Sequence, residues 1–77
     1  MLIQILGMGC AKCEKLEARA RQAATELGLE FQLEKVKDLT RIMAFGVMAT
    51  PALVVDGVVQ VAGRVPGVED IKKILAK

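Results

Sequence analysis

The 77 residues of the chain are enough for one domain with a single hydrophobic core and too few for two. Hydrophobic residues make up 53% of the sequence and aromatic residues only 3%, so the core is expected to be thin and closely packed. The net charge is +2, charges of both signs are interspersed, and tryptophan and tyrosine are absent, which argues against nucleic acid as a partner.

The first residues and the cysteine count indicate the compartment. Residues 1–4 carry no charged leader, and no apolar run approaches the roughly 18 residues of a membrane span. Cys10 and Cys13 are the only cysteines, which is too few for a disulfide framework. We therefore expect a cytoplasmic protein without a membrane partner, in which the cysteine pair is redox-active or metal-binding.

The first half of the chain predicts a strand, a helix and a second strand. Residues 2–6 are almost continuously apolar, as in a central strand covered on both faces. Apolar residues then recur at helical spacing from about residue 11 to residue 27, and Gly28 is expected to cap this helix. Residues 29–36 alternate between apolar and polar side chains, which predicts an edge strand with one solvated face.

The middle of the chain predicts a short helix. Asp38 is placed to cap its first turn, and Gly46 is expected to end it. The apolar side of this helix, which is expected to join the core, consists of Leu39, Ile42, Met43 and Phe45. Residues 47–50 follow as a loop.

A hairpin and a last helix complete the chain. Residues 51–55 and 58–62 are rich in β-forming residues and are separated by Asp56-Gly57, the strongest short-range hairpin signal. Residues 68–77 place apolar side chains at helical spacing, with acidic residues early and lysines late, which suits the helix dipole. The predicted order is therefore βαβαββα.

This order predicts the architecture. The strand, helix and strand form a right-handed parallel unit, and the hairpin adds to the same sheet. We expect a single α/β domain over residues 1–77, with a four-stranded mixed sheet covered by helices on both faces. Cys10 then lies at the carboxyl end of a central strand and the amino end of a helix, where open α/β sheets hold their sites.

Residues 7–13, Gly-Met-Gly-Cys-Ala-Lys-Cys, carry both cysteines at the start of the first helix. At C-x-x-C spacing the two thiols occupy successive turns of one helix face, so they can close a small disulfide or hold one soft metal ion. The helix amino terminus stabilises a thiolate by about 0.3 to 1 kcal/mol, and Lys12 is a further candidate for tuning its pKa. The residues alone leave both chemistries open.

Two motifs together resemble the thioredoxin-fold family, in particular its small archaeal and bacterial thioredoxin-like or glutaredoxin-like redox proteins. The first motif is Gly7-x-Gly9-Cys10-x-x-Cys13, directly after the first strand. The second is Phe-Gly-Val-Met-Ala-Thr-Pro-Ala-Leu at residues 45–53, which is similar to the family segment in which a cis proline opens a strand. The resemblance covers nearly the whole chain and implies the thioredoxin fold.

The resemblance implies a thiol-disulfide oxidoreductase that reduces protein disulfides. Cys10 would attack the substrate disulfide, and Cys13 would resolve the mixed disulfide. The substrate-binding residues would be Met8, Gly9, Thr50, Pro51 and Gly63, with Pro51 in the cis form. The expected partners are protein disulfides and an unidentified reductase. A monomer is expected, with no metal and no cofactor beyond the redox-active disulfide itself.

A soft-metal carrier is the alternative function. Residues 8–13, Met-Gly-Cys-Ala-Lys-Cys, also match the M-x-C-x-x-C loop of small copper chaperones, and two thiolates suit monovalent copper. Those ferredoxin-like domains run βαββαβ and end in a strand, whereas residues 68–77 predict a helix. A third possibility is that both cysteines are inert core thiols.

Overall fold

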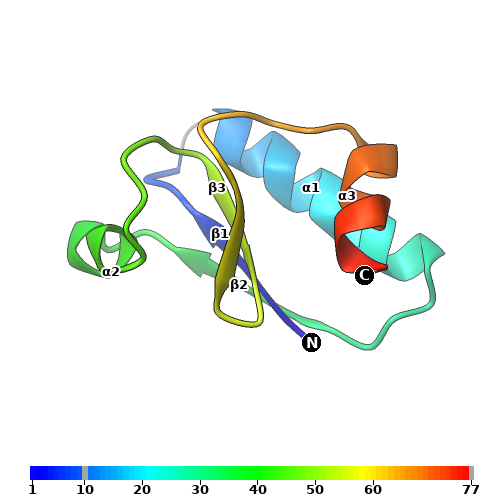
Figure 1. Ribbon diagram of the computed structural model, residues 1–77. Helices are drawn as coiled ribbons and strands as arrows, with labels where there is room; N and C mark the ends of the chain where they lie inside the picture. Colours follow the sequence, from blue (N-terminus) through cyan, green and yellow to red (C-terminus); the bar gives the residue numbers. More distant parts are fainter. Residues whose placement is uncertain (10, 77) are drawn as a thin grey trace.

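The predicted order of elements, βαβαββα, is found in the computed structural model, which describes residues 1–9 and 11–76. The strands are β1 (Leu2–Leu6), β2 (Gln32–Val36), β3 (Ala52–Val55) and β4 (Val58–Ala62). The helices are α1 (Ala11–Glu26), α2 (Leu39–Ala44) and α3 (Val68–Leu75), as Figure 1 shows. None of these described helices is long and apolar enough to cross a membrane.

The strands form one mixed sheet in the order β2-β1-β3-β4. β1 pairs in parallel with β2 and antiparallel with β3, and β3 pairs antiparallel with β4. The predicted central position of β1 and edge position of β2 are therefore confirmed. β1 is central because it buries side chains on both faces of the sheet: Ile3 and Ile5 join one apolar cluster and Leu6 joins the other.

The Asp56-Gly57 turn joins β3 to β4 as predicted. Both residues have positive φ angles, 48° and 84°, which a type I′ hairpin turn requires. Asp56 is also tied to β1, because the backbone N–H of Leu2 donates to its carboxylate and its own N–H donates to the Leu2 carbonyl, each at 2.8 Å. The hairpin is thus specified locally and then anchored to the central strand.

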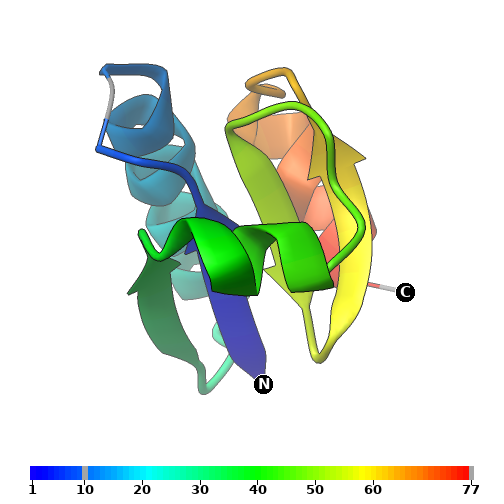
Figure 2. The same ribbon diagram turned by 90° about the vertical axis from the view of Figure 1, so that its left-hand side faces the viewer.

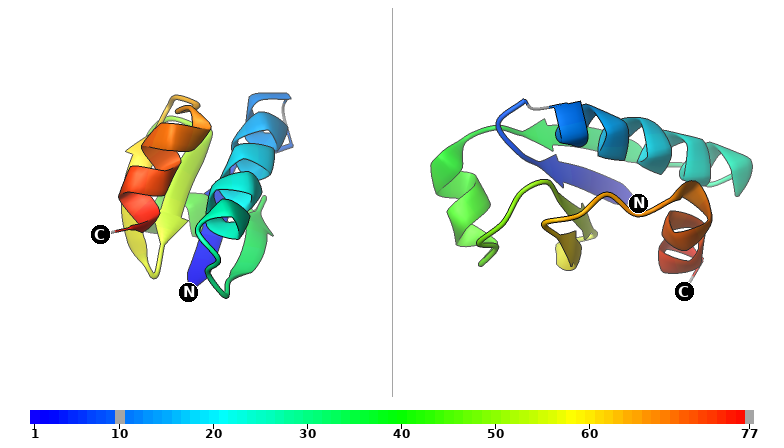
Figure 3. Two further views of the ribbon diagram at one scale, coloured as in Figure 1. Left: turned by 90° about the vertical axis from the view of Figure 1, so that its right-hand side faces the viewer. Right: turned by 90° about the horizontal axis from the view of Figure 1, so that it is seen from above.

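Helices cover both faces of the sheet, in agreement with the prediction. Figure 2 shows α2 in front of the sheet, and the left panel of Figure 3 shows α1 and α3 side by side over the opposite face. Between α1, α3 and the sheet lies the larger apolar cluster, where α1 contributes the fully buried Ala20, Ala23 and Ala24 and α3 contributes Ile71 and Leu75. The alanine side chains are small, so α1 can pack closely against α3 and the sheet at these positions.

The expected apolar side of α2 is only partly correct. Ile42 is 3% exposed and packs on the sheet, but Leu39 is 55% exposed and Met43 is 65% exposed. Leu39, Ile42 and Met43 share one face of the six-residue α2, but only Ile42 is covered by the sheet, and Leu39 and Met43 flank it on the exposed part of that face. Asp38 caps α2 as predicted, accepting the Thr40 N–H at 2.9 Å.

The expected strand over residues 29–36 is too long at its start. β2 begins at Gln32, because the chain spends the preceding residues leaving α1. Gly28, with a φ of 70°, caps that helix, and the Leu29 N–H donates to the Ala24 carbonyl at 3.1 Å. Leu27, which the helical spacing placed on the buried side, is 37% exposed since α1 has already ended at Glu26.

Surface ion pairs tie separate elements together. Glu26 near the end of α1 pairs with Lys72 of α3, and Glu34 of β2 pairs with Arg41 of α2 at 3.1 Å. The hydrogen bond from Lys72 lowers the pKa of Glu26 below its ordinary value of 4.5. The hydrogen bond from Arg41, followed by that from Gln4, lowers the pKa of Glu34 in the same way. Both carboxylates therefore hold their charge more firmly in the folded chain than in the unfolded one.

We expect stability to fall under acid conditions for this reason. The folded pKa values lie below the unfolded value of about 4.5, so the unfolded chain binds more protons in this range. The contribution is complete above the unfolded pKa and is lost as the pH falls through the folded pKa. Urea unfolding midpoints between neutral pH and pH 3 should show the decline, and the Glu26→Gln, Glu34→Gln double variant should decline less. An unchanged slope in that variant would contradict the assignment to these two groups.

Candidate active site

The loop that joins β1 to α1 carries the first motif. The buried Gly7 continues the sheet, since its N–H donates to the Val36 carbonyl at 3.0 Å. Gly9 has a φ of 87°, a left-handed conformation that favours glycine and turns the chain toward α1. Cys10, the expected nucleophile, lies outside the described residues. Its sequence neighbours Gly9 and Ala11 are both exposed to solvent.

Cys13 is the third residue of α1 and is only 6% exposed. Its side chain packs directly against Gly7: a Cβ atom built on Gly7 would collide with Cys13 Sγ and would lie 3.4 Å from Cys13 Cβ. The same position is 4.0 Å from the Cα of Pro51. The end of β1, the first turn of α1 and the start of β3 therefore meet at the Cys13 thiol, and only a residue without a side chain fits between them.

The second motif forms the opposite wall. The Thr50-Pro51 peptide bond is cis, as the resemblance implied. Pro51 is buried and Thr50 is exposed, and no hydrogen bond joins Thr50 to another described residue. Gly63, with a φ of 82°, donates its N–H to the Pro51 carbonyl at 2.8 Å. A Cβ on Gly63 would lie 2.9 Å from the Ala49 Cβ, so this glycine also permits a close approach.

Two hollows of different character adjoin this site. An apolar groove of about 350 Å³ is lined by Met8, Leu39, Ile42, Met43, Val47, Met48 and Thr50, none of which is charged. A smaller pocket of about 60 Å³ beside Cys13 is lined by Ile5, Gly7, Gly9, Cys13, Glu14, Lys35 and Lys37. A larger hollow near Met1 and Asp56 is lined by no residue of either motif, and we assign it no part in the site.

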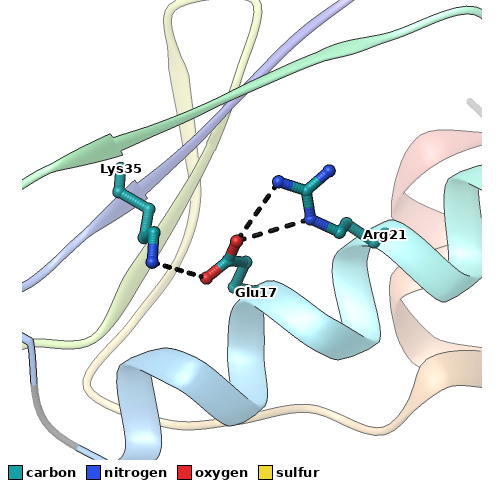
Figure 4. A network of polar contacts seen from close by, with 3 residues as sticks. All are labelled: Glu17, Arg21 and Lys35. Atoms are coloured by element: carbon teal, nitrogen blue, oxygen red, sulfur yellow. Dashed lines mark hydrogen bonds and ion pairs between the residues drawn. The ribbon is translucent and has the colours of Figure 1, made fainter.

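Lys35, which lines the small pocket, belongs to a charged network between α1 and β2 that Figure 4 shows. Glu17 accepts from Lys35 at 3.2 Å and from Arg21 at 3.3 Å. Burial raises the pKa of Glu17, but the hydrogen bonds from Lys35 and Arg21 together outweigh this and hold the pKa below its ordinary value. Glu17 follows Cys13 by four residues, so the carboxylate and the thiol lie one turn apart on the same side of α1.

The structure therefore brings most of the predicted site residues together. Gly9 and Cys13 line the small pocket, Met8 and Thr50 line the apolar groove, Pro51 lies next to Gly7 and Cys13, and Gly63 is hydrogen-bonded to Pro51. Their roles in substrate binding stay predictions. Lys12 is exposed in the first turn of α1 and lines neither of these hollows.

Two features of the site were not predicted from the sequence: the structural need for glycine at position 7, and Lys35 in the pocket of Cys13. The alternation of the strand could have indicated Lys35. Lys35 follows Leu33 by two residues, so both side chains lie on the face of β2 that is covered by α1, and Lys35 is the one near the carboxyl end of the strand, where the cysteines are expected.

The second cysteine of a C-x-x-C sequence lies in the first turn of a helix, beside a cis proline at the end of a mixed sheet, and this combination defines the thioredoxin class of thiol-disulfide oxidoreductases. Comparison with known proteins agrees. Residues 1–76 match the thioredoxin domain family. A thioredoxin of Methanothermobacter thermautotrophicus is 49% identical over 76 residues, which is 99% of both chains. A thioredoxin of Methanocaldococcus jannaschii is 36% identical over 75 residues, 97% of this chain and 86% of that one.

The chain therefore belongs to the thioredoxin family, and it is a thiol-disulfide oxidoreductase. Membership implies protein substrates and a reductase as its partners. The copper-carrier alternative required the order βαββαβ, whereas the described chain ends in α3. The fold expected for that alternative is therefore not the fold of this protein.

Proposed function

We propose that this protein reduces protein disulfides in the cytoplasm as a monomer, with Cys10 as the attacking cysteine and Cys13 as the resolving one. The observation that carries the assignment is the burial of Cys13 behind Gly7 and Pro51. A thiol that is 6% exposed cannot be the first to meet a disulfide on another protein. The burial of Cys13 therefore favours the resolving role for it and leaves the attack to Cys10.

The reaction needs two exchanges. In the first, the Cys10 thiolate attacks one sulfur of the substrate, the substrate S–S bond breaks, and the other sulfur leaves with the electron pair and takes a proton from water. In the second, the Cys13 thiolate attacks Cys10 Sγ and expels the remaining substrate sulfur. The substrate gains two electrons, and the protein is left with a Cys10–Cys13 disulfide that a reductase must reduce. The two side chains are the redox group, so no bound cofactor takes part.

The first exchange requires a thiolate near neutral pH. A free cysteine has a pKa of about 8.5, and lowering it to about 7 takes roughly 2 kcal/mol of preferential stabilisation of the anion. The amino terminus of a helix supplies about 0.3 to 1 kcal/mol, because its first amides and its dipole favour negative charge. α1 is 16 residues long and begins at Ala11. Lys12, exposed in its first turn, is a further, weaker source of positive charge.

The substrate segment would lie along Thr50. Thr50 is exposed, its backbone has no hydrogen-bond partner among the described residues, and it can pair with an extended chain as an added strand. Gly63 and Gly9 border this path without side chains that would obstruct it. The adjoining groove is lined partly by methionines, whose unbranched side chains adapt to different partners; Met8 is 67% exposed and Met48 is fully exposed. Disulfides with an apolar side chain nearby are therefore the favoured substrates.

Trapping of the mixed disulfide tests the roles of the cysteines. The Cys13→Ser variant can complete the first exchange but not the second, so it should accumulate a covalent complex with a protein disulfide such as insulin. The complex is visible on a non-reducing gel, and mass spectrometry locates the bond. Cys10→Ser should form almost none, and the double variant serves as the blank. Equal trapping by the two single variants would contradict the assignment.

A further inference from the structure

Three of the four methionines of the chain line the apolar groove. They come from separate segments: Met8 from the loop after β1, Met43 from α2, and Met48 from the loop before β3. Figure 2 shows α2 in front of the sheet and the chain leading from it to β3. Met8 is 67% exposed, Met43 is 65% exposed and Met48 is fully exposed. The fold therefore concentrates thioether groups at the surface of this groove.

Exposed thioethers are open to oxidation. A hydroperoxide transfers one oxygen atom to the sulfur: the S–O bond forms and the O–O bond breaks, and with hydrogen peroxide the second oxygen leaves as water. The sulfur loses two electrons and the peroxide gains them. The product, methionine sulfoxide, is polar and chiral where methionine is apolar. Because access to the oxidant is needed, the exposure of the three groove methionines makes each of them a target.

Sulfoxides would change the character of the groove. Its other lining residues include the aliphatic Leu39, Ile42 and Val47, and none of its lining residues is charged. An apolar side chain of a substrate would then lie against sulfoxide oxygens and displace the water that they bind, which costs free energy. Thr50 lines the same groove and belongs to the proposed substrate path, so the change occurs directly beside that path.

We propose that Met8, Met43 and Met48 form a modification site, at which oxidation by hydroperoxides makes the groove polar and weakens the binding of disulfides that carry an apolar side chain nearby. The proposal rests on the proposed function, which places that side chain in the groove. The cysteine chemistry is left in place, because Cys13 lines the separate small pocket and none of the three methionines lines it. Oxidation of the groove therefore changes which disulfides are reduced.

The test starts from the protein in its disulfide form, in which Cys10 and Cys13 are protected from hydrogen peroxide. After treatment the peroxide is removed, and dithiothreitol restores the two thiols but leaves the sulfoxides. Peptide mass spectrometry should then find one added oxygen on each groove methionine. The substrates are two peptide disulfides that differ only in having leucine or serine beside the cysteine. Oxidation should raise KM for the leucine peptide about fivefold with little change in kcat, and should hardly affect the serine peptide.

A variant that carries Met8→Leu, Met43→Leu and Met48→Leu is the matched control. Leucine keeps the groove apolar and has no sulfur to oxidise. The variant retains Met1, which is 40% exposed and lines the larger hollow away from both motifs, so oxidation elsewhere on the protein is still present. Its KM for the leucine peptide should be the same before and after peroxide treatment.

Unmodified groove methionines under conditions that oxidise Met1 would overturn the modification site itself. Sulfoxides in the groove with an unchanged KM for the leucine peptide would overturn their effect on binding. An equal rise in KM for the serine peptide, or in the leucine variant, would do the same, because the effect would then arise outside the groove. Equal KM values for the two peptides before any oxidation would contradict the apolar preference stated under the proposed function, and the effect on specificity would be lost with it.

Discussion

Replacing Gly7 with alanine is expected to destabilise the reduced protein by about 2 to 3 kcal/mol, the upper range for inserting a methyl group into a packed site. The added Cβ would collide with Cys13 Sγ and contact Cys13 Cβ, and Pro51 closes the third side. Since Gly7 is buried and its N–H is bonded to Val36, the backbone cannot retreat without losing sheet pairing. The Cys13 side chain must move instead. Urea unfolding of the reduced protein measures the cost, and alkylation of Cys13 reports its displacement.

Gly9→Ala is the matched control, because it separates packing from backbone conformation. A Cβ at Gly9 meets nothing within 4 Å, but the φ of 87° is costly for alanine. This variant should lose only about 1 kcal/mol, from backbone strain, and should leave the burial of Cys13 unchanged. If Gly7→Ala were as stable as Gly9→Ala, the site would have accommodated the methyl group. The close contact at Cys13 would then have no structural importance.

Replacing Leu53 with alanine is expected to cost about 3 kcal/mol of unfolding free energy, within the range of 2 to 5 kcal/mol for buried leucines. Leu53 is fully buried in β3, where it pairs with Ile5 of the central strand on one side and with Val61 on the other. A domain of 77 residues has roughly 4 to 12 kcal/mol in total. The variant should therefore show a much lower urea midpoint and a partly unfolded population at moderate temperature.

Leu39→Ala provides the comparison for Leu53→Ala, since the same atoms are removed from an exposed place. Leu39 is 55% exposed on α2, and its loss should change the unfolding free energy by no more than about 0.5 kcal/mol. Similar costs for the two variants would mean that the groove side of α2 is packed more firmly than its exposure indicates.

Much of the fold follows from local patterns. The continuous apolar run at residues 2–6 predicted a central strand, and Asp56-Gly57 predicted the hairpin, because each depends on side chains and dihedral preferences within a few residues. The wrong predictions of burial arose where contacts with other elements decide which side chains are covered. Met43 has the right spacing for a buried residue, but the sheet covers only Ile42 on that face of α2, and no local signal tells how much of the face the sheet will cover.

The candidate site, like the fold, was predicted in part from local sequence patterns and depends in part on tertiary contacts. From its amino acids alone the chain specified a cysteine pair at the amino end of a helix, because C-x-x-C spacing and helix periodicity are properties of neighbouring residues. Only the tertiary structure placed Pro51 and Gly7 against Cys13 and brought Lys35 from an edge strand to Glu17 on α1. These contacts join residues far apart in the chain, and their geometry depends on how helix and sheet pack, which no local pattern encodes.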